Sequence, residues 1–139
     1  MRKIFFVIFT FCVFMFFACS EEHKNDIAAA KAAKEYYDSL LAGNYAYFVR
    51  GMYLADTIPD GYREELEANA KMFVERVKEE HHDIREVRIM NCVNDTIHIE
   101  KTGKSVHASE AFLVFCFGDS LNEEVVVPMV FHKNRWLMR

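Results

Sequence analysis

The hydrophobic pattern of the chain changes its period at Asp83, and this change restricts the fold more than any other feature of the sequence. Upstream of Asp83, apolar residues recur every three or four positions, which is typical of amphipathic helices. Downstream, they alternate or form short runs bounded by turn residues, which is typical of strands. Helices followed by strands, without alternation of the two, indicate an α+β domain with an antiparallel sheet. The length of 139 residues suits one such domain.

Three helices are expected before Asp83. The first begins near Asn25 or Asp26, either of which can cap it, and ends at Gly43, because glycine accepts the left-handed conformation that closes many helices. The second covers residues 45–53. The third runs to about residue 82 and carries an apolar stripe with steps of three and four. The stripe consists of Tyr62, Leu66, Ala70, Phe73 and Val77.

Four to five antiparallel strands are expected after Asp83, forming one curved sheet on which the helices pack. They cover residues 84–92, 96–100, 105–117, 123–132 and 135–138. A two-residue hairpin turn at residues 102–103 would place His98 opposite His107 and Ile97 opposite Ala108. Pro128 cannot donate a backbone hydrogen bond, so it indicates a sheet edge or a bulge at that position.

The strand over residues 111–117 is apolar on both of its faces. Alternate residues point to opposite sides, and the two sets are Ala111, Leu113, Phe115 and Phe117 against Phe112, Val114 and Cys116. Three helices can cover one face of the sheet, so the other face requires a partner subunit, a surface or a long loop as its cover. We expect a homodimer through this outer sheet face.

Residues 1–18 have the anatomy of a secretory leader, with a positive head, an apolar run from Ile4 to Phe17, and the small residue Ala18 before Cys19. A bilayer core requires about 20 apolar residues, so the run is too short for a transmembrane anchor. Residues 16–19 resemble a lipobox, which implies cleavage before Cys19 and acylation of its thiol. The alternative is plain secretion with an incidental cysteine.

This interpretation divides the chain into a lipoprotein signal peptide over 1–18, a lipidated cysteine with a polar tether over 19–25, and one α+β domain over 26–139. Ser20 resembles a signal for sorting to the outer membrane, and Glu21-Glu22 resembles a surface-export signal. We expect an outer membrane lipoprotein of the cell envelope, facing the periplasm or exposed on the surface.

The charge balance argues against nucleic acid as a partner. The formal net charge is −4, and removal of Arg2 and Lys3 with the leader would lower it by two more. The sequence after the leader contains no basic cluster of the kind that neutralises phosphates. It also contains no phosphate loop or nucleotide fingerprint, so no cofactor is expected.

Several stretches resemble a family of small Gram-negative bacterial lipoproteins of unknown function with a nuclear-transport-factor-2-like (NTF2-like, or cystatin-like) domain. They are residues 32–37, 41–45, 62–63, 117–119, 127–130 and 134–136. The resemblance implies a cone-like fold with a pocket between the helices and the concave face of the sheet. Some members of the superfamily are isomerase-like or dehydratase-like enzymes, and many others only bind ligands or dimerise.

A pocket of this kind would accept a small apolar ligand. Its expected lining is Tyr37, Phe48, Met52, Phe73, Phe115 and Trp136, although the same residues would serve equally well as plain core. Tyr36 and Tyr53 are further candidate hydrogen-bond donors. The superfamily's enzymes use an Asp base that maps onto no residue here. We therefore expect a non-catalytic ligand-binding or interaction module; the alternatives are a small-molecule enzyme and an accessory subunit of a surface complex.

The histidines and cysteines give weaker signals. His98 and His107 would face each other, but only Glu100 is near enough in sequence to be a third ligand, so no metal site is expected. His81-His82, at a helix end, should interact with the helix dipole. Cys92 and Cys116 could form a disulfide after export or pack as free thiols.

Four triplets resemble the Asp-Ser/Thr-aliphatic motif that some Gram-negative bacteria O-glycosylate after export. Thr57, Thr96 and Ser120 are expected in loops or turns, where a glycan could reach them. The fourth residue, Ser39, is expected inside the first helix.

Overall fold

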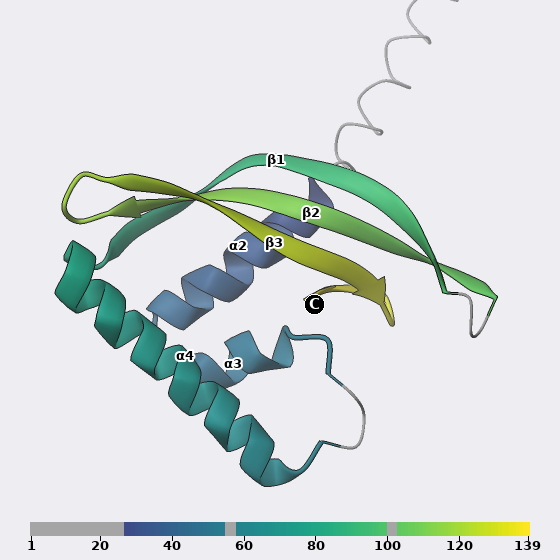
Figure 1. Ribbon diagram of the computed structural model, residues 1–139, viewed down its shortest axis with the longest axis horizontal. Helices are drawn as coiled ribbons and strands as arrows, with labels where there is room; N and C mark the ends of the chain where they lie inside the picture. Colours follow the sequence, from purple (N-terminus) through teal and green to yellow (C-terminus); the bar gives the residue numbers. More distant parts are fainter. Residues whose placement is uncertain (1–26, 55–57, 100–102) are drawn as a thin grey trace, which may run out of the picture.

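The computed structural model describes residues 27–54, 58–99 and 103–139. Within these ranges three helices precede four strands, which form one antiparallel sheet in the order β1-β2-β3-β4 (Figure 1). The helices are α2 (Ala28–Leu41), α3 (Tyr45–Arg50) and α4 (Asp60–His81). The strands are β1 (Ile84–Ile99), β2 (Lys104–Phe117), β3 (Asn122–His132) and β4 (Arg135–Met138). The expected α+β class and antiparallel sheet are confirmed.

The ends of the first two described helices differ slightly from the prediction. α2 follows Ile27, whose side chain makes no capping hydrogen bond, and the expected capping residues Asn25 and Asp26 lie outside the described residues. α3 ends at Arg50, three residues before the expected end. The side chain of Asn44 accepts a hydrogen bond from the Tyr47 backbone N–H, which caps α3 and separates it from α2.

The buried side of α4 is rotated relative to the predicted stripe. Ala70, Val74 and Val77 are buried, whereas Phe73 is 37% and Tyr62 is 46% exposed. A four-three spacing through residue 74 is as compatible with a helix as the predicted spacing through residue 73, so the sequence pattern alone does not choose between them. The rotation leaves Phe73 at the border between the core and a hollow between the helices.

The strands differ from the prediction at one place. β1 is a single strand, although two strands were expected over 84–92 and 96–100. Asn94 and Asp95 favour turns, but both are paired across the sheet with β2, at Ser109 and Ala108. Cross-strand pairing therefore overrides the local preference of these residues. The pairing of β1 with β2 shifts between Ile84 and Glu86 and between Ile89 and Asn91, and such irregularities increase the local bend.

Pro128 lies within β3 opposite Glu110, and no register shift interrupts the β2–β3 pairing. The predicted bulge is therefore absent from this pairing. The short β4 pairs with β3 from Met129 to His132. The carbonyl oxygen of Pro128 accepts the Arg139 backbone N–H at 3.0 Å, just beyond the end of β4. Pro128 therefore lies just beyond the part of β3 that pairs with β4, and its missing N–H leaves no ladder bond to β4 unmade. This position is compatible with the sheet edge that the proline indicates.

The core lies between α2 and the inner face of the sheet. Ala29, Ala30 and Ala33 are at most 1% exposed, and their small side chains let α2 approach β1, β2 and β4 closely. Leu113 and Met129, from neighbouring strands, are completely buried beneath it. Burial of side chains of this size stabilises the fold by about 1.5–3 kcal/mol each.

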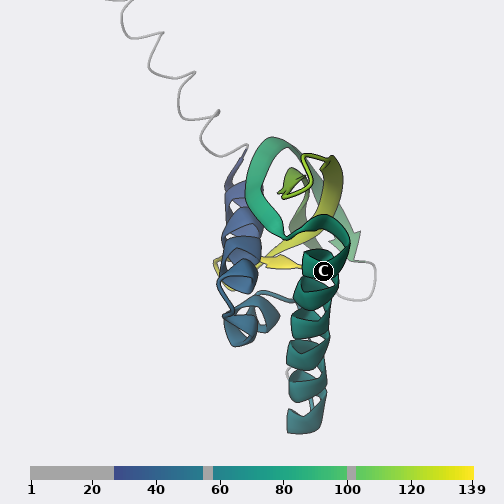
Figure 2. The same ribbon diagram turned by 90° about the vertical axis from the view of Figure 1, so that its left-hand side faces the viewer.

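All three described helices lie on one side of the sheet. In Figure 1 the sheet arches over α2, with α3 and α4 below it. Figure 2 shows α4 extending away from the strands, so that its C-terminal end is the part near the sheet. Among the described residues, no helix combines the length and the apolar character needed to cross a membrane.

Candidate functional site

A hollow of about 250 Å³ lies between the three helices, and we call it the helical pocket. Its lining is mostly apolar, with the Asn69 amide and the Tyr37 hydroxyl as the polar groups. The lining residues are Tyr37, Leu40, Phe48, Met52, Leu66, Asn69, Ala70 and Phe73. Four residues of the predicted lining, Tyr37, Phe48, Met52 and Phe73, therefore surround one hollow.

Tyr37 connects the helices to the sheet at this hollow. Its ring packs edge-on against Phe48, with centroids 5.3 Å apart, and against Phe115, at 5.1 Å. Burial raises the pKa of the Tyr37 hydroxyl above its ordinary value of 10.0, so the group remains a hydrogen-bond donor at neutral pH. Within the described residues this hydroxyl has no hydrogen-bond partner. A ligand in the pocket could therefore accept a hydrogen bond from it.

A second hollow of about 330 Å³ lies between α4 and the inner face of the sheet, and we call it the sheet pocket. It shares Tyr37 and Phe73 with the helical pocket, so the two hollows adjoin. Phe115, another residue of the predicted lining, belongs here. The lining residues are Tyr37, Phe73, Arg76, Val77, Glu80, His81, Phe115, Phe117, Glu123 and Val125. The sheet pocket thus adds charged side chains to an apolar floor.

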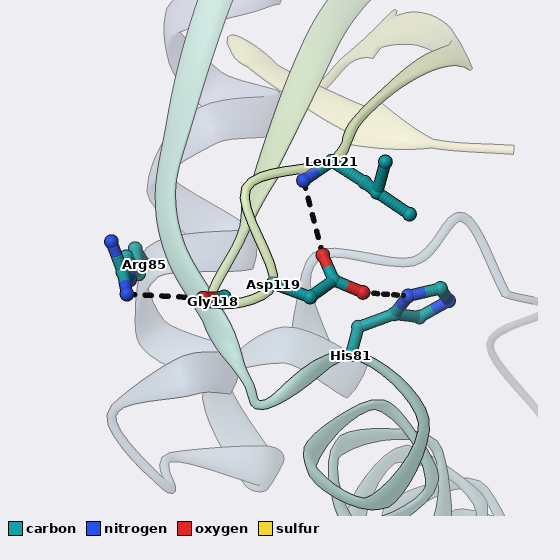
Figure 3. A network of polar contacts seen from close by, with 5 residues as sticks. All are labelled: His81, Arg85, Gly118, Asp119 and Leu121. Carbon is teal, nitrogen blue, oxygen red and sulfur yellow. Dashed lines mark hydrogen bonds and ion pairs between the residues drawn. The ribbon is translucent and has the colours of Figure 1, made fainter.

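His81, a lining residue of the sheet pocket, also connects the end of α4 to the β2–β3 turn (Figure 3). His81 Nδ1 lies 2.9 Å from Asp119 Oδ2, and the His81 ring stacks on Phe117 with centroids 4.3 Å apart. The other oxygen of Asp119 accepts the Leu121 backbone N–H at 3.1 Å. Arg85, at the start of β1, also bonds the turn by donating from its guanidinium to the Gly118 carbonyl oxygen at 3.0 Å. These bonds hold the helix end against the sheet.

The charge of Asp119 is stabilised by this arrangement. The hydrogen bond with His81 is the largest of the effects that lower the pKa of the Asp119 carboxyl below 3.8. A histidine that is oriented by a carboxylate can accept a proton at its other nitrogen. The described residues that line the sheet pocket, however, include no serine, threonine or cysteine that such a base could activate. The contact therefore supplies a fixed polar edge to the pocket.

Sequence reasoning missed this contact. His81 and His82 were expected to interact with the helix dipole, but His81 bonds the Asp119 side chain from the β2–β3 turn, and His82 takes the left-handed conformation after the helix. The local signal is Gly118-Asp119 directly after a strand, which is typical of a turn whose side chain bonds the backbone. Pairing that turn with the end of α4 requires the tertiary fold.

Trp136, the remaining residue of the predicted lining, lies at a different hollow of about 400 Å³ between α2, α3 and β4. We call it the arginine pocket, because Arg50 and Arg135 both line it. The other lining residues are Ala32, Glu35, Tyr36 and Tyr47. Tyr36, a candidate donor in the sequence, instead donates its hydroxyl to the Trp136 carbonyl oxygen at 2.8 Å. The third candidate, Tyr53, is 49% exposed and packs against His132.

The predicted histidine pairing is wrong by two residues. His98 lies opposite Ser105, His107 lies opposite Thr96, and Ile97 lies opposite Val106 rather than Ala108. His98 Nδ1 is 3.4 Å from the Ser105 hydroxyl. Within the ranges that the structure describes, no group of three or more His, Cys, Asp or Glu side chains could hold a metal ion. Glu100, the suggested third ligand, lies outside those ranges.

Cys92 and Cys116 are both free thiols. Cys92 lies opposite Ala111, five residues along β2 from Cys116, which corresponds to roughly 17 Å in a strand. Because Ala111 and Cys116 are an odd number of residues apart in β2, the two thiols also lie on opposite faces of the sheet. The Cys92 sulfur instead lies 2.7 Å from the hydroxyl oxygen of the buried Ser109. The disulfide alternative is therefore wrong, and the thiols are partly packed.

The predicted modification sites fall in three situations. Thr96 is exposed but lies within β1, so its expected position in a loop is wrong. Ser120 is exposed in the β2–β3 turn with a φ of 71°, and Ser39 lies inside α2 as expected. Thr57 and the lipidation site Cys19 lie outside the described residues.

Comparison with protein-family models and with curated proteins finds no match. A solved structure with a similar fold is the crystal structure of a Campylobacter jejuni protein described as an NTF2-like transpeptidase. The two chains are 13% identical with a TM-score of 0.56, and the match covers 76% of this chain and 92% of the other. At this identity the likeness shows the fold alone. The chain has an NTF2-like fold, as the sequence resemblance implied.

Proposed function

We propose that the chain is an exported lipoprotein, anchored in the cell envelope through acyl chains on Cys19, whose domain binds a small and largely apolar ligand without transforming it. The ligand would occupy the helical pocket and extend into the adjoining sheet pocket. The two hollows measure about 250 and 330 Å³, and together they match the size of ordinary small-molecule sites.

The observation that carries this proposal is the position of Tyr37. Its ring belongs to the walls of both pockets, and its protonated hydroxyl has no partner within the described residues. Apolar walls with a small number of placed polar groups are typical of ligand sites, because the walls supply affinity and the polar groups fix orientation. A ligand with one hydrogen-bond acceptor on an apolar body fits this arrangement.

Peptide transfer, which the description of the Campylobacter jejuni structure names, has no support from the lining of these pockets. A covalent transpeptidase requires an activated nucleophile, ordinarily a serine or cysteine next to a base. His81 could act as the base, but the described residues that line the two pockets supply no such nucleophile. Binding without catalysis is therefore the function that these side chains favour.

The lipid anchor is proposed from the sequence of the leader. Cys19 precedes Ile27, the first described residue, by eight positions, and a chain of that length spans at most about 28 Å. The domain would consequently remain close to the membrane surface, where apolar molecules are plentiful. We further propose that a second copy of the chain covers the outer face of the sheet.

Dye binding tests the ligand site. A soluble fragment that begins at Ser20 retains every core residue, since these lie between Ala29 and Met138. The neutral dye N-phenyl-1-naphthylamine becomes fluorescent in apolar sites, and we expect saturable binding to this fragment. Phe73→Ala should weaken binding by about fivefold to tenfold, because Phe73 contributes to both pockets.

Met72→Ala is the matched control, because Met72 is 56% exposed and lines neither pocket. It should leave the dye affinity unchanged. Equal affinity in the Phe73→Ala and Met72→Ala variants, or no saturable binding to the unmodified fragment, would contradict the proposed ligand site.

Metabolic labelling with palmitate tests the anchor independently. The full chain, expressed in a Gram-negative host, should incorporate label, and Cys19→Ala should incorporate none, because the thiol is the expected acceptor of the acyl chain. Cys92→Ala is the control and should be labelled like the unmodified chain. Equal labelling of the Cys19→Ala variant would refute the anchor without affecting the ligand site.

A further inference from the structure

The arginine pocket is a built site that the proposed ligand does not use. It lies where α2, α3 and β4 meet, and it shares no lining residue with the helical or the sheet pocket. Three aromatic rings and two guanidinium groups contribute to its walls. Its volume of about 400 Å³ is larger than that of either neighbouring hollow.

The aromatic walls are held in place by specific contacts. Tyr36 donates its hydroxyl to the Trp136 carbonyl oxygen, and the Tyr36 and Tyr47 rings pack with centroids 5.6 Å apart. Tyr47 in turn donates its hydroxyl to Glu35 Oε1 at 2.8 Å. Gly51 lies directly against the Tyr36 ring, since a Cβ at this position would approach its carbons to 2.5–2.8 Å. The flat surfaces of the pocket are thus preorganised before any ligand arrives.

The two arginine residues adjoin in this pocket. Arg135 donates from Nη2 to the Arg50 carbonyl oxygen at 3.1 Å, and Arg50 donates from Nε to the Ala46 carbonyl oxygen at 3.4 Å. These bonds leave the other guanidinium N–H groups available. Within the described part of the chain neither guanidinium forms an ion pair. One hollow of a chain whose net charge is −4 therefore holds two guanidinium groups that form no ion pair with any described residue.

Glu35 is the one carboxylate of the lining, and one of its oxygens is occupied by Tyr47. This hydrogen bond is the main reason why the pKa of the Tyr47 hydroxyl is raised, while the positive charge of Arg135 acts in the opposite direction. The positive charge of Arg135 therefore acts on the Tyr47 hydroxyl in the wall of the pocket. With two arginines and one glutamate, the lining carries one net positive charge.

We propose that the arginine pocket binds a small oxyanion attached to a flat apolar ring. The guanidinium groups of Arg50 and Arg135 would bind the oxyanion, because their planar sets of N–H donors match carboxylate and phosphate oxygens. The ring would lie against the aromatic wall of Tyr36, Tyr47 and Trp136. A single negative charge on the ligand would neutralise the lining.

Trp136 provides a direct readout of this site, because it is the single tryptophan of the chain. The full lipidated chain in mild detergent is titrated with benzoate, with phenyl phosphate and with neutral benzamide, while the Trp136 fluorescence is recorded. We expect a saturable change with benzoate, phenyl phosphate or both, which distinguishes a carboxylate from a phosphate ligand. Benzamide should give no saturable change, because it lacks the charge.

Substitutions then test the two arginines. Arg135→Gln and Arg50→Gln should each weaken binding by about tenfold, since each removes a charge-assisted contact while preserving the length of the side chain. Arg63→Gln, which removes an exposed charge of α4 outside the pocket, and Phe73→Ala, which alters the proposed ligand site, should leave the affinity unchanged. The affinity should also fall as salt is added.

Three results would overturn the proposal: no saturable response to either anion, an equal response to benzamide, or full affinity in the Arg50→Gln/Arg135→Gln double variant. Because the reporter and the variants are confined to the arginine pocket, none of these results affects the proposed ligand site between the helices.

Discussion

Asp119 links the sheet to α4 through one hydrogen bond whose strength depends on its negative charge. The pKa of this carboxyl is lowered, chiefly by the hydrogen bond with His81. A lowered pKa in the folded state means that the contact stabilises the fold above the ordinary pKa of 3.8. This contribution is lost as the pH falls through the lower, folded-state pKa, because the carboxylate then becomes protonated.

Asp119→Asn should therefore lower the free energy of unfolding at pH 6, and the difference from the unmodified chain should shrink below about pH 4. Urea unfolding curves at several pH values measure this difference. Asp38→Asn is the control, because Asp38 pairs with Lys34 on the exposed side of α2, where an ion pair contributes little. A difference for Asp119→Asn that persists unchanged into acid would show that the charge of Asp119 has no part in the contact.

Gly118 allows the β2–β3 turn to approach the end of α4. A Cβ at this position would lie 2.1 Å from the His82 carbonyl oxygen, and the Gly118 N–H donates to the Asp83 carbonyl oxygen at 2.8 Å. Gly118→Ala should lower the free energy of unfolding by about 1–3 kcal/mol, because backbone must move to accept the methyl group. Gly61→Ala, where nothing lies within 4 Å, should be neutral or slightly stabilising. Thermal unfolding compares the two variants directly.

At the level of elements, the β1–β2 hairpin shows where sequence reasoning succeeds and where it fails. Alternation of apolar residues located β2 within one residue. Ala111, Leu113, Phe115 and Phe117 share one face as predicted, and the structure shows that this is the buried face toward the helices. The register failed, because it was inferred from one turn signal, whereas the structure pairs Ile97 with Val106. A shift of two residues keeps every side chain on its predicted face, so the hydrophobic pattern cannot detect it.

Engineered disulfides test this register. In the double variant Ile97→Cys/Val106→Cys the two Cβ atoms lie directly opposite, within the reach of a disulfide. Oxidation should close this pair. In Ile97→Cys/Ala108→Cys the partners are about 7–8 Å apart on the diagonal, so closure should be slow and incomplete. Counting free thiols by mass spectrometry after alkylation gives the result, and preferential closure of the 97–108 pair would support the predicted register instead.

The candidate site was predictable only where it depends on the local pattern of apolar residues. Tyr37, Phe48 and Met52 were located because large apolar side chains on successive short helices must converge on a common centre. Trp136 lies instead at the arginine pocket, because its position depends on how β4 packs against α2 and α3. The contacts of Arg135 with Arg50 and of His81 with Asp119 join segments far apart in the chain. Local periodicity contains no information on such pairs.

At the level of the whole molecule, the proposed dimer depends on the outer face of the sheet. The three described helices occupy one side (Figures 1 and 2). Strand alternation and cross-strand pairing place Phe112, Val114 and Val126 on the other side, where Val126 is 47% exposed opposite the half-buried Phe112. Apolar side chains grouped on an open sheet face are typical of an interface, and a second copy of the chain would present the same strip in return.

Val126→Asp tests this association. The side chain is already half-exposed, so the folded monomer should tolerate the carboxylate, whereas burying that charge between two sheets would be strongly unfavourable. We expect the Ser20–Arg139 fragment to form dimers at high concentration in analytical ultracentrifugation, and the Val126→Asp variant to remain monomeric. Met72→Asp places the same charge on the exposed side of α4 and should leave the dimer intact. If the unmodified fragment stays monomeric at the highest concentration, the outer face has another cover and the dimer is excluded.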